Sequence, residues 1–401
     1  MPRSFISVHV GSIVVGSIAF AAQAHALDEC PSFSNKVVVV GSTAIKPLLA
    51  EVAKIVVAGS SQDAAPATVL YVGGGSCIGV DAALNGTAQK PDSVAYWDAN
   101  GVEQACAPAT GVDLVADIGV SDVFASTCTA LPNGLPSNVV DFQGPVQAMT
   151  FVVPQASSQE SISAEAAYYV FGFGNDSGVE PWTDESFIFQ RNDQSGTQRM
   201  LAAAIGVDAS RWFGTKTASS SEMRQSIITA GSKNAEATLG ILSADEADAN
   251  RATLKVLAFQ DLAKSCGYYP DRDVSSNEKQ SVREGDYPIW GPMHLLATVD
   301  NTQRPRNPLA ADIVAYIIGT KAPPAGLDLV ALEAQRHVVP QCAMRVRRTQ
   351  EMGRLSPFSP DEPCGCYYEK LANGSTSCQA CAAEGDCDAT SICAFGFCEK
   401  N

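Results

Sequence analysis

Three segments of the chain share one pattern, in which an apolar strand leads through a Gly/Ser-rich turn into a helix. The predicted strands are 37–40, 69–72 and 187–189, the turns are 41–43, 73–76 and 191–197, and the helices end near 57, 84 and 205. Pro47 supports the first helix start, because the N–H that proline lacks would have no partner there. Strands that alternate with helices predict an α/β fold with mostly parallel sheets.

The second half of the chain continues the alternation of strands and helices. The predicted strands are 150–154, 239–242, 254–259 and 287–299, and the predicted helices are 162–173 and 308–318. The length of the chain favours two domains over one. The order of the elements predicts two discontinuous lobes with crossover strands near Gln147 and Trp290. We place lobe I at 27–147 together with 292–345, and lobe II at 148–291.

The first 26 residues have the pattern of a secretory signal peptide. An apolar run at 8–22 follows Arg3, and Ala24-His25-Ala26 forms a small-residue cleavage site. We expect cleavage after Ala26 and a periplasmic, secreted or cell-surface protein; a buried N-terminal strand is the alternative. The run is short for a membrane span, and no later stretch is apolar enough to form one.

Export agrees with the cysteine content, because disulfides form in oxidising compartments. Six of the 13 cysteines lie between 30 and 342, and seven lie between 364 and 398. The odd total predicts at least one free thiol or a bond to another chain. We expect a small disulfide-rich module at 362–401, joined by a linker at 346–361, and a zinc knuckle is the alternative.

The formal net charge of −16 argues against nucleic acid and anionic membranes as partners. It does not exclude a small anionic ligand. Backbone N–H groups at a helix start can hold an oxyanion even where the rest of the surface is acidic.

The Gly/Ser turns suit such an anion, because each precedes a predicted helix whose first N–H groups have no partner. Arg191 adds a guanidinium, which can grip a tetrahedral oxyanion through two parallel hydrogen bonds. Any single turn is more simply a helix cap. The prediction therefore depends on the convergence of all three turns.

These segments, taken in order, resemble the phosphate-binding proteins of bacterial ABC importers. The shared segments are Gly41-Ser42-Thr43, Gly74-Gly75-Ser76, Asp117 to Asp122, and Arg191 with Ser195-Gly196-Thr197. The resemblance covers about 35–318 and implies a two-lobed periplasmic-binding-protein clamp of type 2 with phosphate between the lobes. It implies a ligand site formed by Ser42, Thr43, the Ala44 backbone, Ser76 and Asp122 from lobe I, and by Arg191, Ser195, Gly196 and Thr197 from lobe II. It also implies an ABC permease in the inner membrane as partner, and no cofactor.

Asp122 has a distinct role under this resemblance. A carboxylate only accepts hydrogen bonds, so it favours an anion that carries a proton, as hydrogen phosphate does and sulfate does not. The structural alternative is that Asp122 caps a helix or pairs with Arg191. Other tetrahedral oxyanions, such as arsenate, remain open.

The chain departs from that family at 87–116 and in its Cys-rich tail. We expect the insertion to form a hairpin beside the cleft, tied by a disulfide from Cys106 to Cys77 or Cys128. Because Cys77 directly follows Ser76, a disulfide there would stiffen a ligand loop.

Two other classes of function compete with solute binding. Only His294 and His337 remain after removal of the leader, and metal-ligand spacings, Gly-x-Ser-x-Gly and a P-loop lysine are missing, so we expect neither an enzyme nor a metal site. The second class is a surface or extracellular protein that uses the clamp as a scaffold and the tail for docking. Phosphate binding would distinguish the two.

Overall fold

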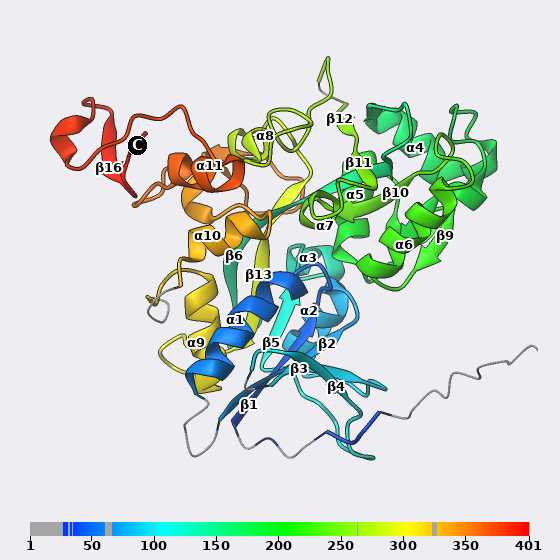
Figure 1. Ribbon diagram of the computed structural model, residues 1–401. Coiled ribbons are helices and arrows are strands. Elements are labelled where there is room, and N and C mark those ends of the chain that lie inside the picture. Colours follow the sequence, from blue (N-terminus) through cyan, green and yellow to red (C-terminus); the bar gives the residue numbers. More distant parts are fainter. Residues whose placement is uncertain are drawn as a thin grey trace, which may run out of the picture.

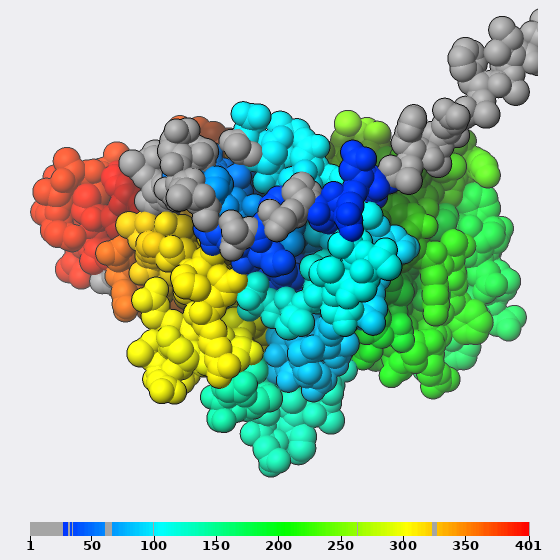
Figure 2. Space-filling view, turned by 90° about the horizontal axis from the view of Figure 1, so that it is seen from below, coloured from blue at the N-terminus to red at the C-terminus, as the bar shows by residue number. Residues whose placement is uncertain are grey.

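The computed structural model describes residues 27–30, 33, 35–60, 66–98, 100–262, 264–322 and 327–400. The predicted signal peptide at 1–26 lies outside the described residues. Figure 1 shows two lobes, with a C-terminal module on the side away from lobe II. In the space-filling view the lobes lie directly against each other (Figure 2).

A mixed sheet runs through both lobes in the order β10-β6-β13-β5-β1-β2-β3-β4, with β11 beside β6. Its strands are β1 (Asn35–Gly41), β2 (Ala67–Gly73), β3 (Val94–Trp97), β4 (Glu103–Cys106), β5 (Ile118–Ser121), β6 (Val139–Pro154), β10 (Gly240–Ser243), β11 (Leu254–Val256) and β13 (Trp290–Thr298). Strands β1, β2 and β5 are parallel. Strand β13 pairs antiparallel with both β5 and β6.

The valine run of β1 explains the layers of lobe I, because alternate residues of a strand face opposite sides of a sheet. Val37 and Val39 pack with α1 (Lys46–Gly59) and α9 (Pro308–Ile317). Val38 and Val40 belong to a second apolar cluster on the other face, where α2 (Ser76–Asn85) lies. Burial on both faces is why this strand is continuously apolar.

Lobe II has its own apolar core, built on the second half of β6. The helices around it are α4 (Ala164–Phe173), α5 (Gly196–Ile205), α6 (Ser220–Gly231), α7 (Ala244–Asp248) and α8 (Gln280–Glu284). Two short pairs complete it: β7 (Ser161–Ser163) with β12 (Ala258–Gln260), and β8 (Phe189–Arg191) with β9 (Thr215–Thr217). Strand β6 connects the lobes, since it pairs with β13 before Met149 and with β10 and β11 from there on.

Most predicted elements are present, and the differences are local. The strand predicted at 187–189 begins only at Phe189, because 185–187 forms a turn of 3₁₀ helix. The strand predicted at 254–259 is interrupted at Leu257, whose N–H bonds to Phe151. The helix predicted from 162 begins at Ala164, where the Ser163 side chain caps it. The insertion forms the hairpin β3–β4.

One disulfide prediction was wrong. Cys106 pairs with Cys30, which ties the hairpin to the start of the described chain, and Cys77 pairs with Cys128. The other bonds join Cys342–Cys364, Cys366–Cys378, Cys381–Cys393 and Cys387–Cys398. All seven tail cysteines are thus oxidised, which leaves none of them as a thiolate for zinc. Cys266 is the free, exposed thiol that the odd total requires.

The C-terminal module is anchored to the body of the protein. Cys342–Cys364 joins the two directly, and Asn373 at the end of α11 (Gly365–Asn373) hydrogen-bonds to Glu278. The segment predicted as a linker carries the short pair β14 (Val346–Arg347) and β15 (Ser356–Pro357). The remaining short elements are α3 (Ala125–Cys128), α10 (Leu329–Gln335), β16 (Ser391–Ala394) and β17 (Phe397–Lys400).

None of the helices in the described ranges is long and apolar enough to cross a membrane.

Candidate functional site

Three polar loops of lobe I leave the same edge of the sheet, because β1, β2 and β5 are parallel neighbours. Ser42 directly follows β1, Ser76 starts the helix after β2, and Asp122 directly follows β5. Ligands of α/β sheets bind at the carboxyl ends of such strands. The predicted ligand residues of lobe I therefore lie together at this edge of the sheet.

Asp122 is held between two serine hydroxyls. Ser42 Oγ donates to its carboxylate at 2.6 Å, and Ser76 Oγ donates to Oδ2 at 3.0 Å. Ser42 Oγ also accepts from the Ala44 N–H at 3.1 Å, so the first turn is fixed as well. Tyr71 donates to the Ser42 carbonyl at 2.6 Å from β2.

Burial governs the charge of Asp122. The residue is 2% exposed, and this desolvation raises the pKa of its carboxyl. Hydrogen bonds from Ser42 and Ser76, and the positive charge of Arg191, act in the opposite direction. Burial is the largest of these influences, so the pKa of the carboxyl lies above its usual value.

Arg191 contributes the positive charge of the site from the end of β8 in lobe II. It is 2% exposed, and burial lowers the pKa of its guanidinium. Nη1 donates to Ser220 Oγ at 3.1 Å, and Nη2 lies 3.4 Å from Thr43 Oγ1 on lobe I. Its buried Nε has no hydrogen-bond acceptor among the described residues. A buried donor of this kind is costly unless an acceptor arrives from outside the chain.

The start of α5 lies against the lobe I loops. Ser195 caps this helix through the Gln198 N–H, and Thr197 is buried within its first turn. A Cβ added to Gly196 would lie 2.2 Å from Ser76 Oγ and 2.9 Å from Asp122 Oδ2. Glycine is thus required at 196 for the lobes to approach this closely.

A backbone hydrogen bond joins the same two loops directly. The Cys77 N–H donates to the Gln194 carbonyl at 3.0 Å. Gly75, which precedes it, has φ +115° and would clash with Gln194 if it carried a side chain. The structure therefore brings Ser42, Thr43, Ala44, Ser76, Asp122, Arg191, Ser195, Gly196 and Thr197 to one junction between the lobes.

Ser220 is a site residue that the sequence analysis missed. Its hydroxyl accepts from Arg191 and lies 3.4 Å from Thr43 Oγ1. It begins α6, so a fourth serine turn precedes a helix at the cleft. The signal was present in Ser219-Ser220-Ser221.

Gln147 and Asp245 form a second link across the cleft that the sequence did not reveal. Gln147 Nε2 donates to Asp245 Oδ1 at 2.7 Å and lies 3.4 Å from the Ala44 carbonyl. Burial raises the pKa of Asp245 to about 7. Gln147 stands where β6 passes from one lobe to the other, so this residue links Asp245 of lobe II to the first ligand turn.

The segment 345–354, which follows lobe I, also contacts residues beside the site. Glu351 accepts from the Phe124 N–H at 3.2 Å, two residues beyond Asp122. Arg348 lies over the Trp290 ring, 4.2 Å from its centroid, and donates to the Pro288 carbonyl at 2.9 Å. These contacts join 345–354 to both the ligand loop and the crossover strand.

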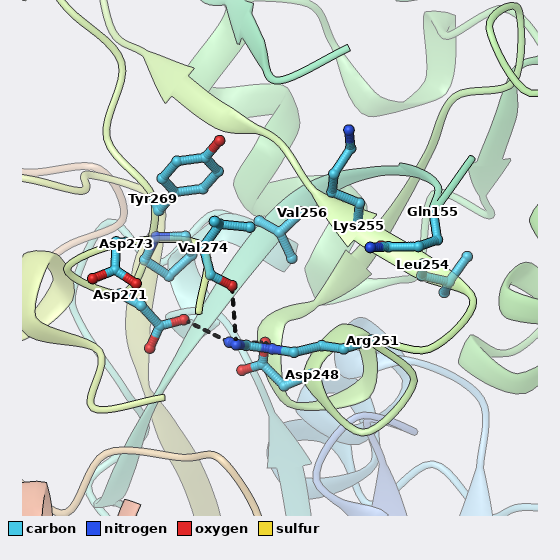
Figure 3. A pocket seen from close by; sticks show the side chains of 11 residues that line it. Gln155, Asp248, Arg251, Leu254, Lys255, Val256, Tyr269, Asp271, Asp273 and Val274 are labelled. Atoms are coloured by element: carbon cyan, nitrogen blue, oxygen red, sulfur yellow. Dashed lines mark hydrogen bonds and ion pairs between the residues drawn. The ribbon is translucent and has the colours of Figure 1, made fainter. Parts of the chain in front are cut away.

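A separate polar pocket lies in lobe II, away from these residues. Figure 3 shows Arg251 between the carboxylates of Asp248 and Asp271, which also bind the buried Lys279. Two cations and two anions compensate one another there. The ion pairs satisfy the buried charges of one another. In the described part of the chain, no hydrogen bond or ion pair joins this cluster to the cleft residues.

The two histidines do not form a catalytic group. His294 is fully buried, its Nδ1 lies 2.7 Å from Asp141, and its ring packs edge-on against Phe124. His294 is therefore a packed histidine of the core. His337 is half-buried and has φ +56° at the end of α10.

This architecture is similar to that of known proteins. The PBP superfamily domain matches residues 21–321, and no curated protein matches the chain significantly. A solved structure from Clostridium perfringens, named as a phosphate ABC transporter substrate-binding protein with bound phosphate, is similar over 76% of this chain and 99% of its own. The two share 12% sequence identity, with a TM-score of 0.51. An ABC-type phosphate transport receptor from Vibrio cholerae is similar over 76% of this chain and 99% of its own, at 15% identity and a TM-score of 0.47.

These findings confirm the α/β two-lobed clamp with a disulfide-rich C-terminal region. They agree with a solute-binding protein that is not an enzyme, and the disulfides agree with export. Because the matched domain covers well over half of the sequence, the chain belongs to the PBP superfamily.

Proposed function

We propose that this protein is exported and captures phosphate between its two lobes. The observation that carries the proposal is the buried Arg191 guanidinium, whose Nε has no acceptor among the described residues and whose Nη1 and Nη2 contact the hydroxyls of Ser220 on lobe II and Thr43 on lobe I. A tetrahedral oxyanion beside it would supply that acceptor. The Thr43 hydroxyl and the N–H groups in the first turn of α5 would supply further donors. The single hydroxyl proton of Ser42 goes to Asp122 in this structure, so Ser42 would donate to the ligand by turning from that carboxylate.

Asp122 gives the site its selectivity in this proposal. A buried carboxylate beside the anion accepts a hydrogen bond only from a ligand that carries a proton. Hydrogen phosphate and hydrogen arsenate meet that condition at neutral pH, and sulfate does not. The site would therefore reject sulfate by repulsion rather than by size.

Ligand capture would couple to closure of the clamp. Groups from both lobes touch the anion only when the lobes meet, so phosphate stabilises the closed state by its differential affinity. In uptake, an ABC permease in the inner membrane would recognise that closed form. Export would follow from the leader at 1–26, with the mature chain in the periplasm or at the cell surface.

Calorimetric titration of the mature, ligand-stripped protein with phosphate and then sulfate at neutral pH tests the proposal. We expect saturable phosphate binding and no sulfate response. Arg191→Ala should weaken phosphate binding by roughly a hundredfold or more, because it removes several charge-assisted hydrogen bonds. Arg211→Ala is the matched control, since Arg211 is exposed and lies outside the cleft.

Three outcomes would decide against parts of this proposal. Unchanged phosphate affinity in Arg191→Ala would show that phosphate does not bind at this site. Binding of both anions would support an anion site between the lobes but would contradict the selective role of Asp122. A lack of response to either anion would favour the scaffold alternative, in which the anchored C-terminal module docks a partner.

A further inference from the structure

One buried carboxyl group in the described part of the chain has no hydrogen-bond donor or cation as a partner. Each of the other buried carboxylates in the described part of the chain accepts a hydrogen bond or pairs with a cation: Asp122, Asp245, Asp248, Asp271, Glu278 and Glu399. Glu333 is 6% exposed, and its side chain has neither kind of partner among the described residues. Burying a carboxyl group without a partner is costly, so its presence calls for an explanation.

Glu333 lies on α10, in a groove of about 660 Å³ between lobe I and the C-terminal module. The volume falls within the usual range of ligand pockets. The walls are mostly apolar and come from both parts, among them Pro145, Ile318, Leu329, Val330, Phe358 and Phe395. Figure 1 shows α10 next to α11, at the junction with the module. Phe395 is 44% exposed, which is high for an aromatic ring.

The charge of the groove is entirely negative. Asp361 and Glu362 also line it and are exposed, and no lysine or arginine is among the described lining residues. Burial, and to a lesser degree the charge of Asp328, raise the pKa of Glu333 to about 8. A cation placed beside Glu333 would allow it to ionise, since an opposite charge favours the charged form.

We propose that this groove binds a lysine side chain presented by a partner polypeptide, with the ammonium group on Glu333 and apolar neighbours of that lysine against the walls. A lysine combines the point charge that one carboxylate can satisfy with an apolar stem that packs along aliphatic surface. The groove is larger than one side chain needs and is bounded by two phenylalanines and three prolines, Pro145, Pro340 and Pro360, which favours a peptide segment over an isolated amine. This site is separate from the phosphate site and does not depend on it.

The probe for this proposal is the peptide acetyl-Ala-Leu-Lys-Leu-Ala-amide, titrated into the full mature protein with its disulfides intact. An analogue with norleucine in place of lysine keeps the apolar stem and removes the charge. We expect the lysine peptide to bind roughly tenfold more tightly than the analogue, as for a charge-assisted hydrogen bond. Glu333→Gln should abolish that preference, and Glu165→Gln, on the exposed face of α4, should retain it.

Phe395→Ala provides a second test that leaves Glu333 in place. It should weaken the binding of both peptides to a similar degree, because it removes an apolar wall of the groove and leaves the charge of Glu333 in place. The proposal is overturned if neither peptide binds, if both bind equally to the unmodified protein, or if Glu333→Gln keeps the preference for lysine. The glutamine variant should fold normally, since it replaces a buried carboxyl group by a neutral group of the same size.

Discussion

Ser76 and Asp122 hold each other through two hydrogen bonds that run in opposite directions. The Ser76 hydroxyl donates to Asp122 Oδ2 at 3.0 Å and accepts from the Asp122 N–H at 3.1 Å. One hydroxyl thus positions both the backbone and the side chain of Asp122. Ser42 donates to the same carboxylate, so this side chain is held at the cleft by residues that follow β1 and β2. A selective site requires such support.

Asp122→Asn tests whether this carboxylate selects a protonated anion. An asparagine amide can donate to the ligand, whereas a carboxylate cannot, so the variant should accept sulfate. We expect the ratio of phosphate affinity to sulfate affinity to fall by roughly ten- to a hundredfold in calorimetric titration. The exposed Asp92→Asn serves as control. An unchanged ratio in Asp122→Asn would show that selectivity has another origin.

Gly196→Ala tests the close approach of the lobes. The added methyl group would meet Ser76 Oγ at 2.2 Å, so the closed state should lose stability relative to the open one. We expect phosphate affinity to fall at least about tenfold, while the melting temperature of the ligand-free protein changes little, because alanine favours the helix. Gly59→Ala, where a methyl group meets open space, should leave affinity unchanged. Equal affinities in both variants would contradict the observed lobe contact.

Removal of the Cys77–Cys128 disulfide should weaken both stability and binding. The bond closes a loop with a sequence separation of 51, and chain entropy assigns about 4 kcal/mol to a loop of that length. Cys77→Ser combined with Cys128→Ser should therefore lower the free energy of unfolding by an amount of this order in denaturant titrations. Phosphate affinity should fall too, because the disulfide fixes the loop whose Cys77 backbone N–H donates to the Gln194 carbonyl across the cleft. Cys266→Ser, which alters only the free thiol, should match the unmodified protein.

The stability of the protein should depend on pH through Asp245. Burial raises its folded pKa to about 7 from 3.8, so the unfolded carboxyl group loses its proton first as pH rises. The contribution of Asp245 to stability is therefore greatest below about pH 4 and decreases up to about pH 7, by at most about 4 kcal/mol.

Asp245→Asn isolates that contribution, because its amide oxygen can still accept from Gln147. The free energy of unfolding of the variant, measured by denaturant titration from pH 4 to pH 8, should fall less steeply than that of the unmodified protein. Parallel curves for the two proteins would contradict a raised pKa. Asp92→Asn again supplies the exposed control.

The strand–turn–helix segments were predictable from the sequence because their signals are local. The valine run of β1 alternates between two buried faces, and the Gly/Ser turns directly precede α1, α2 and α5. Arg191 could be selected for the same reason, since it stands between a strand and a helix start. These patterns were sufficient for the α/β class and for the choice of Arg191, whereas the clamp and the full set of nine candidate ligand residues followed from the resemblance to phosphate-binding proteins.

Only the tertiary structure decided which distant residues meet. Cys106 pairs with Cys30 across 76 positions, and nothing in the spacing distinguished that partner from Cys77 or Cys128. Ser220 reaches Arg191, and Glu333 lies in a groove completed by the C-terminal module, because separate elements pack together there. Local patterns specify helices and strands through backbone preference and apolar periodicity. Contacts between remote segments depend instead on how the lobes and the module pack in three dimensions.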